Sequence, residues 1–559
     1  MLLVGATGAF GERLAEGLIR SGIAVIAVAR DPARLQRLVQ RLGPHALPES
    51  RDRSDIDPAW LAELRRQHPS LFALVDASGP FQSIDYRLPR AAIAAGLHYV
   101  DLADARDFVG GIDALDSEAR SVGIAMLSGA SSTPALSHAV LDHLARDAQE
   151  IVSIDVAIAP GNRAPRGLSV MQSILSMVGQ PIRVYLSGRW TTQPGWGLNT
   201  AIALPGIGVR QVALCETPDL DLLVSRYRPR ADAIFRAGLE LPLLHRGLQA
   251  LGKLVRFGII RSLAPFAHPL RALAETTKLI GTDRGGMRVD MRLIDRDGVL
   301  RHHWWTLTVE AGDGPYIPTL PALAALKMLA TGDLAWRGAS PCVGILHYSA
   351  IAEEFAAYTI KTEFGETGMP PPVFRRLLGS AFDDLPPAIR QAHDVQGFLA
   401  LEGEADATGP DNWTGSAIAF LFRLPRPGKS LPVRVEMRSE ADGSETWTRI
   451  YPGVTMRSNL RNPDSATRQV DEVFGPVAVR LAWQSTTDGL ELEILRARLF
   501  GIPLPRFLRP RSNARESIDA GGSFHFDVPI ALPLIGTIVH YRGWLKVVGG
   551  NGYAPDLST

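Results

Sequence analysis

The sequence predicts an α/β Rossmann domain with a doubly wound parallel sheet, then a mixed α/β domain, then a C-terminal β-rich domain built as a sandwich or partly closed barrel. Three observations predict this order. A glycine-rich turn follows a buried strand at the start, strands and helices alternate through residues 1–150, and long alternating strands fill the last third. Because 559 residues exceed one hydrophobic core, we place the domains at 1–150, 151–360 and 371–550.

The first domain opens with a strand, a glycine loop and a helix. Residues 2–4 are apolar, residues 5–11 carry three glycines, and apolar residues then recur at helical spacing through Ile19. Glycines at this spacing allow a tight turn, bring bare backbone close to a diphosphate, and let the helix pack on the sheet. The dinucleotide-binding residues predicted here are Gly5, Ala6, Thr7, Gly8, Ala9, Phe10 and Gly11.

The end of the second predicted strand, residues 23–29, indicates which dinucleotide binds. An NAD site usually offers a carboxylate there, whereas this chain has Ala29 followed by Arg30. A guanidinium suits a 2′-phosphate, so we expect NADP(H), with NADPH preferred over NADH. The alternative interpretation is that Arg30 is a solvated residue at a strand end, because Asp31 and Pro32 form an ordinary helix start.

Further strands at 71–76, 98–101 and 123–127, with a helix at 86–95, continue the parallel sheet. Ligands of such sheets bind beyond the carboxyl ends of the strands. The cofactor contacts expected there are Ser78, Gly79, Pro80, Phe81 and Ser131, and the proton-handling candidates are Tyr99, Asp101 and Asp104, with Ser131 and Ser132 as hydrogen-bond donors. The competing interpretation of each is loop solvation or capping.

The second domain begins near Val152, with alternating strands at 154–158, 287–294 and 304–310. Between them we expect residues 231–279 to form a helical, amphipathic segment with many leucines. Its basic residues are Arg236, Arg246, Lys253, Arg256, Arg261 and Arg271. The segment is interpreted either as a layer that covers the sheet, or as a surface that enters a membrane interface or holds a long apolar substrate.

The last third alternates apolar and polar residues at 433–437, 446–451, 477–483, 490–495 and 524–528. Turn signals such as Asp442-Gly443 separate these strands, which predicts an antiparallel sheet. Trp447 and Trp544 are expected in a core or pocket. Arg449 or Arg542 is expected to pair with Glu445 or Asp527, in an ion pair that fixes strand register.

Several motifs together resemble a known family. The glycine loop, Asp76-Ala77-Ser78-Gly79-Pro80-Phe81, the segment 94–102 and Ser128-Gly129-Ala130-Ser131-Ser132-Thr133-Pro134 are similar to the saccharopine dehydrogenase-like oxidoreductases. The resemblance runs to about Ser349 and implies an NAD(P)-binding Rossmann domain with a second domain that closes over the nicotinamide. Ala135 replaces a glycine frequent in the family, and clustered basic residues for an adduct such as saccharopine are not evident. Residues 371–548 resemble a bacterial domain of unknown function found behind such oxidoreductase domains.

Composition excludes several classes of function. A net charge of +1, from 59 basic and 58 acidic residues, disfavours nucleic-acid binding. Two distant cysteines and no long apolar run favour a cytoplasmic protein, peripheral at most at the inner membrane face. A mean hydropathy of +0.05 leaves room for a membrane face or a homo-oligomer. The GxSxG, HExxH and Walker motifs are missing, and His302-His303 lies in an alternating strand, so we expect no metal site.

Two classes of protein remain open. The first is an NADP(H)-dependent oxidoreductase that acts on a carbonyl, imine or enoyl group of an apolar small-molecule substrate. The second is a non-catalytic dinucleotide-binding redox sensor or lipid- or partner-binding protein. In the first two domains no tyrosine has lysine four residues later, so the short-chain dehydrogenase mechanism is excluded. The chain has a complete second domain that can cover a nicotinamide. A sensor would not need such a domain, so its presence favours the enzyme.

Overall fold

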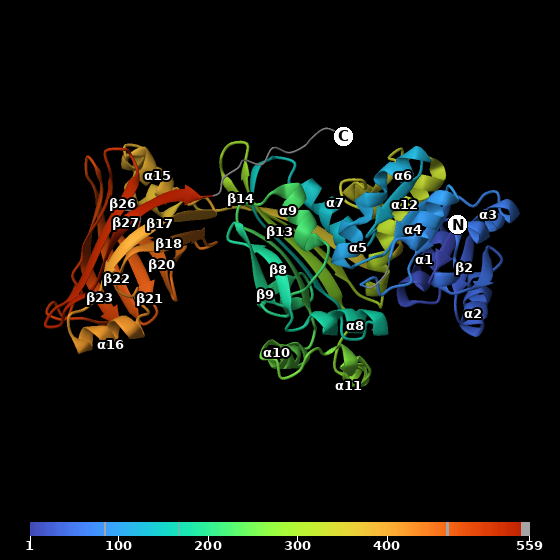
Figure 1. Ribbon diagram of the computed structural model, residues 1–559, viewed down its shortest axis with the longest axis horizontal. Helices are drawn as coiled ribbons and strands as arrows, with labels where there is room; N and C mark the ends of the chain where they lie inside the picture. Colours follow the sequence, from blue (N-terminus) through green and yellow to red (C-terminus); the bar gives the residue numbers. More distant parts are fainter. Residues whose placement is uncertain (83–84, 166, 465–468, 549–559) are drawn as a thin grey trace.

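The computed structural model describes residues 1–82, 85–165, 167–464 and 469–548. These residues form three sheets arranged in a row (Figure 1). The Rossmann domain lies at one end, the mixed sheet in the middle and the C-terminal domain at the other end. The predicted fold class is confirmed. The predicted C-terminal domain boundary at 550 runs two residues past the described part.

The first sheet is parallel, and its described strands are almost wholly buried apart from one edge strand, Ala46–Ser50. Its described strands lie in the order β15-β6-β5-β4-β1-β2-β3. Strands from the first 150 residues are β1 (Leu2–Val4), β2 (Val25–Ala29), β3 (Ala46–Ser50), β4 (Ala73–Asp76), β5 (His98–Asp101) and β6 (Ala125–Ser128). The helices are α1 (Ala9–Arg20), α2 (Pro32–Leu42), α3 (Pro58–Gln67), α4 (Arg87–Ala94), α5 (Arg106–Gly110), α6 (Asp116–Ser121) and α7 (Ser137–Leu144). Short, almost wholly apolar strands are typical of sheets that helices cover on both sides.

One strand of this sheet comes from far along the chain. β15 (Gly338–Pro341) pairs in parallel with β6, after α12 (Leu320–Thr331) has returned to the first domain. α12 packs on α1, where a Cβ added to Gly17 would lie 3.0 Å from Leu323 Cδ2. The predicted limits at 150 and 360 therefore need a correction, because this segment completes the Rossmann sheet. Its strand is too short to show a clear pattern of its own.

The second sheet is mixed, in the order β10-β11-β12-β7-β13-β14-β16, with β8 and β9 joined to β12. Its strands are β7 (Ala148–Ala159), β8 (Pro181–Leu186), β9 (Arg189–Pro194), β10 (Thr200–Leu204), β11 (Gly208–Leu214), β12 (Asp232–Gly238), β13 (Gly285–Asp295), β14 (Leu300–Val309) and β16 (Ile360–Gly368). Its helices are α8 (Leu168–Met177), α9 (Asp219–Tyr227), α10 (Pro242–Arg256) and α11 (Ala267–Thr276), and α13 (Tyr348–Ala352) precedes β16.

The expectation of a helical segment over the whole of 231–279 is wrong at its start. β12 is a strand in the middle of the sheet, parallel to β7, and Arg236 on it is 8% exposed and pairs with Asp155 at 2.9 Å. The short apolar run Ala233-Ile234-Phe235 suits a buried strand between two neighbours, and the leucine content of the residues that follow obscured it. The helices α10 and α11 that follow do lie on the surface.

The C-terminal domain is a closed antiparallel barrel. Ten of the described strands pair in sequence around it, and β22–β23 and β17–β27 complete the ring, with the short β24 attached to β23. The strands are β17 (Phe398–Thr408), β18 (Gly428–Ser439), β19 (Glu445–Tyr451), β20 (Val454–Asp464), β21 (Gln469–Phe474), β22 (Val477–Ser485), β23 (Gly489–Leu499), β24 (Ile502–Pro503), β25 (Asn513–Ile518), β26 (Phe524–Leu532) and β27 (Gly536–Val548). α14 (Val373–Leu378) and α15 (Pro387–His393) adjoin one end, and α16 (Trp413–Leu421) lies at the other (Figure 1).

Polar contacts attach the barrel to the middle sheet. Arg438 on β18 forms an ion pair with Asp232 on β12, with Nη2 3.0 Å from Oδ1. Arg434 of the same strand donates to the carbonyl oxygen of Ser187. None of the described helices is long and apolar enough to cross a membrane.

Candidate functional site

The glycine loop between β1 and α1 forms a tight turn. The backbone N–H groups of Gly5 and Ala6 both donate to the carbonyl oxygen of Val28 in β2, at 3.0 and 3.1 Å. Gly5 has a φ of +79°, and a Cβ added there would lie 2.7 Å from Cα of Ser78. This position requires glycine both for its left-handed backbone and for the close approach of the next loop.

The amino end of α1 faces the same edge of the sheet. The helix begins after Gly8, which has no side chain to cap the N–H groups of the first turn. A Cβ on Gly11 would collide with the carbonyl oxygen of Gly5, so a bare backbone packs the helix onto the loop. An uncapped helix start beside a glycine turn binds anions such as a diphosphate. The residues present here therefore fit a dinucleotide cofactor.

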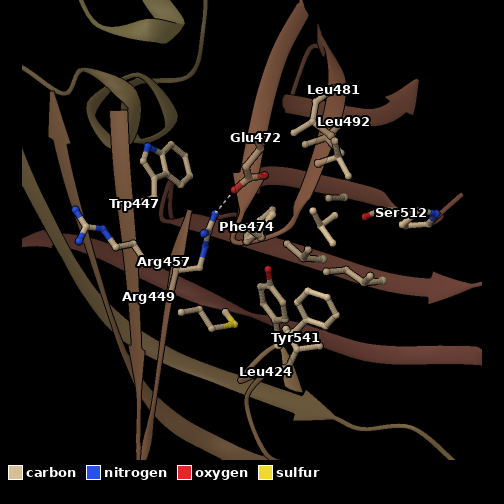
Figure 2. Close-up of a pocket in the computed structure, with 18 of the residues that line it drawn as sticks. Leu424, Trp447, Arg449, Arg457, Glu472, Phe474, Leu481, Leu492, Ser512 and Tyr541 are labelled. Atoms are coloured by element: carbon tan, nitrogen blue, oxygen red, sulfur yellow. Dashed lines mark hydrogen bonds and ion pairs between the residues drawn. The ribbon is translucent and has the colours of Figure 1, made fainter. Parts of the chain in front are cut away.

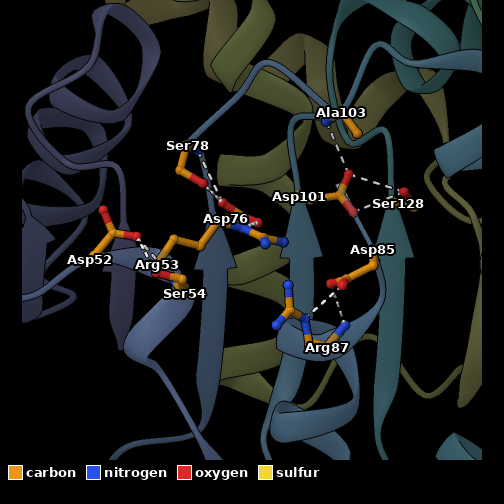
Figure 3. A network of polar contacts seen from close by, with 10 residues as sticks. All are labelled: Asp52, Arg53, Ser54, Asp76, Ser78, Asp85, Arg87, Asp101, Ala103 and Ser128. Atoms are coloured by element: carbon orange, nitrogen blue, oxygen red, sulfur yellow. Dashed lines mark hydrogen bonds and ion pairs between the residues drawn. The ribbon is translucent and has the colours of Figure 1, made fainter. Parts of the chain in front are cut away.

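The loop after β4 is fixed by Asp76, which is fully buried (Figure 3). Its Oδ1 accepts from the N–H and the hydroxyl of Ser78, at 3.0 and 2.5 Å, and its Oδ2 accepts from Arg53 Nε at 2.8 Å. Of the predicted cofactor contacts here, Ser78 and Gly79 are partly exposed and Pro80 is exposed, whereas Phe81 is 4% exposed and packs on Phe108.

Asp101 joins the loops that follow β5 and β6. It is fully buried and accepts from the N–H of Ala103 at 3.0 Å, the N–H of Gly129 at 2.7 Å and the hydroxyl of Ser128 at 2.8 Å (Figure 3). Burial raises the pKa of Asp101 to about 7, although these hydrogen bonds oppose the shift. The partly exposed Ser131 follows in the same loop, and Ser132 is 8% exposed.

Tyr99 and Asp104, the other two proton-handling candidates, occupy opposite environments. Tyr99 is fully buried, and this burial, together with nearby Asp101 and Asp76, raises its pKa well above the ordinary value. The Asp104 side chain is exposed to solvent, although desolvation by the atoms around its carboxyl raises its pKa. Gln82 Nε2 is 3.5 Å from Asp104 Oδ1 and also donates to the hydroxyl of Ser173 on α8, at 2.8 Å.

The contact of Gln82 with Asp104 and Ser173 lies where the first two domains meet. Beyond Ser173, α8 provides Met177, whose sulfur lies 3.5 Å from the sulfur of Cys215. Burial, with Asp104 nearby, raises the pKa of Cys215 to about 12, so its thiol stays neutral. Arg106 on α5 joins the two domains. Its guanidinium pairs with Asp221 on α9 and donates to the carbonyl oxygen of Arg183 at 2.9 Å.

A basic group surrounds the end of β2. The Arg30 side chain is 82% exposed and its Nε is 3.7 Å from Asp52 Oδ2. Arg34 on α2 donates to the carbonyl oxygen of Thr7 in the glycine loop, at 3.1 Å. Asp31 is confirmed as the cap of α2, because its side chain accepts from the N–H groups of Ala33 and Arg34. The guanidinium groups of Arg30 and Arg34 therefore lie at the end of β2 and beside the glycine loop.

The structure gathers the glycine loop, the loop after β4, Asp101, Asp104 and Ser131 at the carboxyl edge of one sheet. Sequence reasoning missed four contributors to this edge: Arg34, Arg53, Gln82 and Ser173. Arg34 had a local signal, because a residue three positions after a helix cap lies on the first turn. Ser173 had none, since it comes from a helix of the other domain.

Comparisons with known proteins place both ends of the chain. Residues 1–151 match the family model described as "Saccharopine dehydrogenase NADP binding domain", and residues 385–545 match "Domain of unknown function (DUF4166)". A search of curated proteins finds no match. Apo saccharopine dehydrogenase (L-Glu forming) from Saccharomyces cerevisiae is 12% identical, with 65% of this chain and 99% of that chain covered, at a TM-score of 0.49. A probable dehydrogenase from Thermotoga maritima is 12% identical, with 63% and 92% covered, at a TM-score of 0.31.

The parallel sheet, the glycine turn and the uncapped start of α1 define a dinucleotide-binding Rossmann domain. The N-terminal part of the chain is thus similar to the saccharopine dehydrogenase NADP-binding domain family, and its C-terminal part to the DUF4166 family. The chain has a saccharopine dehydrogenase-like, NADP-binding oxidoreductase fold, and its closed barrel lies in the part that matches DUF4166.

Proposed function

We propose that this protein is an oxidoreductase that reduces a carbonyl, imine or enoyl group of an apolar substrate with NADPH, or carries out the reverse oxidation. The observation that carries this proposal is the contact of Gln82 with Asp104 and with Ser173, which brings α8 of the second domain beside the nucleotide loops. The second domain would thereby cover the reacting end of a cofactor. Met177 and Cys215, 8% and 6% exposed, form an apolar, buried layer behind this contact.

Bound nicotinamide would supply or accept the hydride, so the protein has to place the substrate and handle one proton. Of Tyr99, Asp101 and Asp104, only Asp104 is exposed to solvent. Because desolvation raises its pKa, its carboxyl keeps a proton to a higher pH than an ordinary aspartate, and it can give that proton to oxygen or nitrogen as the hydride adds to carbon. We assign positioning roles to Asp101, which joins two loops, and to Tyr99 beneath it.

The test is NADPH consumption with a panel of apolar aldehydes, ketones, imines and enoyl thioesters. We expect turnover with at least one class, and a kcat reduced by about 100-fold or more in Asp104→Asn with NADPH affinity unchanged. The control is Asp113→Asn, because Asp113 is an exposed aspartate that does not contact Gln82 or Ser173. Tight NADPH binding without turnover across the panel would instead support a redox sensor, and an unimpaired Asp104→Asn would remove the proton-handling role.

The basic group beside β2 supports NADPH over NADH. We predict that Arg30→Asp weakens NADPH binding by about tenfold or more and changes NADH binding little, because a fork of N–H donors is replaced by a like charge at the 2′-phosphate. Fluorescence titration of both cofactors measures this. Arg66→Asp, at the C-terminal end of α3 and the opposite edge of the sheet, makes the same charge change as a control. Equal losses for both cofactors would overturn the 2′-phosphate assignment.

We also propose that the surface of α10, α11 and the turns after them contacts a membrane. Large apolar side chains are exposed there, notably Leu243, Phe257, Ile259, Leu279 and Ile280, at 69–89%. Exposed Lys253, Arg256 and Arg261 accompany them, which is the combination that favours an anionic bilayer surface.

We expect the full chain to float with vesicles that contain phosphatidylglycerol, and the triple variant Lys253→Glu, Arg256→Glu, Arg261→Glu to stay in solution. Vesicles of phosphatidylcholine alone test the contribution of charge. If the protein instead forms a dimer through this face and does not float, the surface is an interface between two copies and the membrane contact is refuted.

A further inference from the structure

The barrel encloses a cavity of about 920 Å³. Protein interiors are packed so closely that few voids exceed the size of a water molecule, so this space is no packing defect. Its volume lies near the top of the range for small-molecule sites, roughly 300–1,000 Å³. Side chains can fill the interior of an eight-stranded barrel, and the ten strands here leave more room.

The half of the cavity near α16 is lined mostly by apolar side chains. The strand ends there provide Phe474, Val477, Leu499, Leu504, Ile530 and Leu532, and α16 adds Ile418 and Leu421. A ligand in this half gains by removing apolar surface from water.

The opposite end is plugged by aromatic rings. Phe374 from α14 and His393 from α15 lie 3.9 Å apart between ring centroids, and Trp447 and Trp483 surround them. Trp483 lines the cavity and is 7% exposed, and its Nε1 has no hydrogen-bond partner among the described residues. Because buried N–H groups are almost always hydrogen-bonded, a ligand that offers an acceptor here would be stabilised.

The charged groups beside this end are balanced. Arg449 lies over the ring of Trp447, forms an ion pair with Glu472 at 3.3 Å and donates to the hydroxyl of Ser458 at 2.9 Å. Figure 2 shows this pair at the cavity, with the Tyr541 hydroxyl directed toward the same space. Glu445, expected as a partner of Arg449, instead accepts from Val373 and Trp447. The Arg449–Glu472 pair is neutral and Glu516 is bonded to His393, so an anionic group placed at this plugged end finds no unpaired buried cation among the described lining residues. The two other arginines that line the cavity, Arg423 and Arg457, have exposed side chains.

The α16 end carries exposed apolar side chains on the outside. Trp413 and Phe420 of α16, Phe500 and Phe507 after β23, and Leu534 at the β26–β27 turn are 65–92% exposed. In Figure 1 this end lies along the same side of the molecule as α10 and α11. Apolar residues gathered around one end of a hollow barrel suit transfer of a ligand from an apolar phase.

We propose that the C-terminal barrel binds one uncharged, largely apolar molecule of lipid size that carries an acceptor oxygen, such as a long-chain ketone, ester or alcohol. The ligand passes through the α16 end, its chain lies among the apolar residues there, and its oxygen accepts from Trp483 Nε1 beside Arg449. This binding does not depend on the activity of the Rossmann domain.

The experiment titrates the full chain with Nile red, a neutral apolar fluorophore, and then displaces it with dodecan-2-one, dodecane or dodecanoate. We expect saturable binding of one Nile red, with displacement by dodecan-2-one at lower concentration than by dodecanoate. Trp483→Phe removes the N–H together with the five-membered part of the indole ring, so dodecane reports the loss of apolar contact alone. We expect this variant to weaken dodecan-2-one about fivefold more than it weakens dodecane.

Val479→Trp fills the cavity and should weaken Nile red binding by at least about tenfold, because overpacking excludes the ligand. Ala482→Trp adds the same ring to β22 outside the cavity lining and should bind normally. Val528→Trp fills the cavity from β26 and replaces Val479→Trp if that variant fails to fold. Absence of saturable binding to the wild type, or normal binding to a folded filled variant, overturns the site. If dodecanoate binds more tightly than dodecan-2-one, the proposal that the ligand is uncharged is overturned.

Discussion

Gly5→Ala is expected to abolish measurable NADPH binding while the protein remains folded. The new Cβ would lie 2.7 Å from Cα of Ser78 and 2.8 Å from the carbonyl oxygen of Ala77, and both of these atoms belong to backbone that cannot rotate away. One of the two loops must therefore move, which also shifts the start of α1. Charge-assisted hydrogen bonds contribute about 1.5–3 kcal/mol each, so losing two phosphate contacts weakens binding by about 100-fold or more.

The matched control for this variant is Gly22→Ala. Gly22 has a φ of +78°, almost the value at Gly5, but a Cβ added there meets nothing within 4 Å. Both variants therefore share the cost of a left-handed alanine, about 1 kcal/mol, and only Gly5→Ala adds the collision. Isothermal titration with NADPH and a thermal melt of each variant separate the two effects. Equal NADPH affinity in the two variants would show that the close approach of the loops is not needed for the nucleotide.

The glycine loop could be read from the sequence because its requirements are local. A left-handed turn, a bare backbone and a helix start leave their mark within eleven consecutive residues. Arg30 follows the same logic, since its position is set by the end of one strand. Only part of the contact between Asp104, Gln82 and Ser173 could be predicted. Asp104 comes directly after a predicted strand, whereas Ser173 belongs to a helix of another domain and has no local signal.

Non-local pairing explains what the sequence could not predict. Alternation in the last third predicted antiparallel strands, but ring closure depends on β17 pairing with β27, about 140 residues away. The same closure turns inward-facing residues such as Trp483 from sheet positions into the wall of a cavity. At β12 a helix was predicted where the structure has a strand. The burial of this segment between β7 and β11 determines its structure, although the residues after it have a composition typical of helices.

Asp219→Asn is expected to stabilise the protein at pH 8 and to have little effect at pH 4. Asp219 on α9 is fully buried, and its Oδ1 lies 3.6 Å from Nδ1 of His138, which is also fully buried. Burial raises the pKa of Asp219 from 3.8 to about 7 and lowers that of His138 to about 4, so above pH 4 the histidine is neutral and does not neutralise the carboxylate. The aspartate difference corresponds to about 4 kcal/mol.

The sign of this effect follows from which state holds the proton. Below pH 4 the Asp219 carboxyl is protonated in both the folded and the unfolded chain, and its contribution is fully present. As the pH rises toward 7 the unfolded chain ionises first, so the free energy of unfolding falls until the folded carboxyl ionises too. Asparagine cannot ionise, and the variant should therefore lack this decrease.

Asp221→Asn, two residues further along α9, is the control of opposite sign. Although burial opposes the shift, Arg106 and Arg183 lower the pKa of Asp221, so its ionised form stabilises the fold at neutral pH and the variant should lose stability there. Thermal melts of wild type and both variants at pH 4, 6 and 8 measure the three trends. If Asp219→Asn lowered the Tm most strongly at pH 6–8, Asp219 would be ionised in the folded protein and paired with a charged His138. The buried pair would then hold the loop after β6 by charge rather than as two neutral groups.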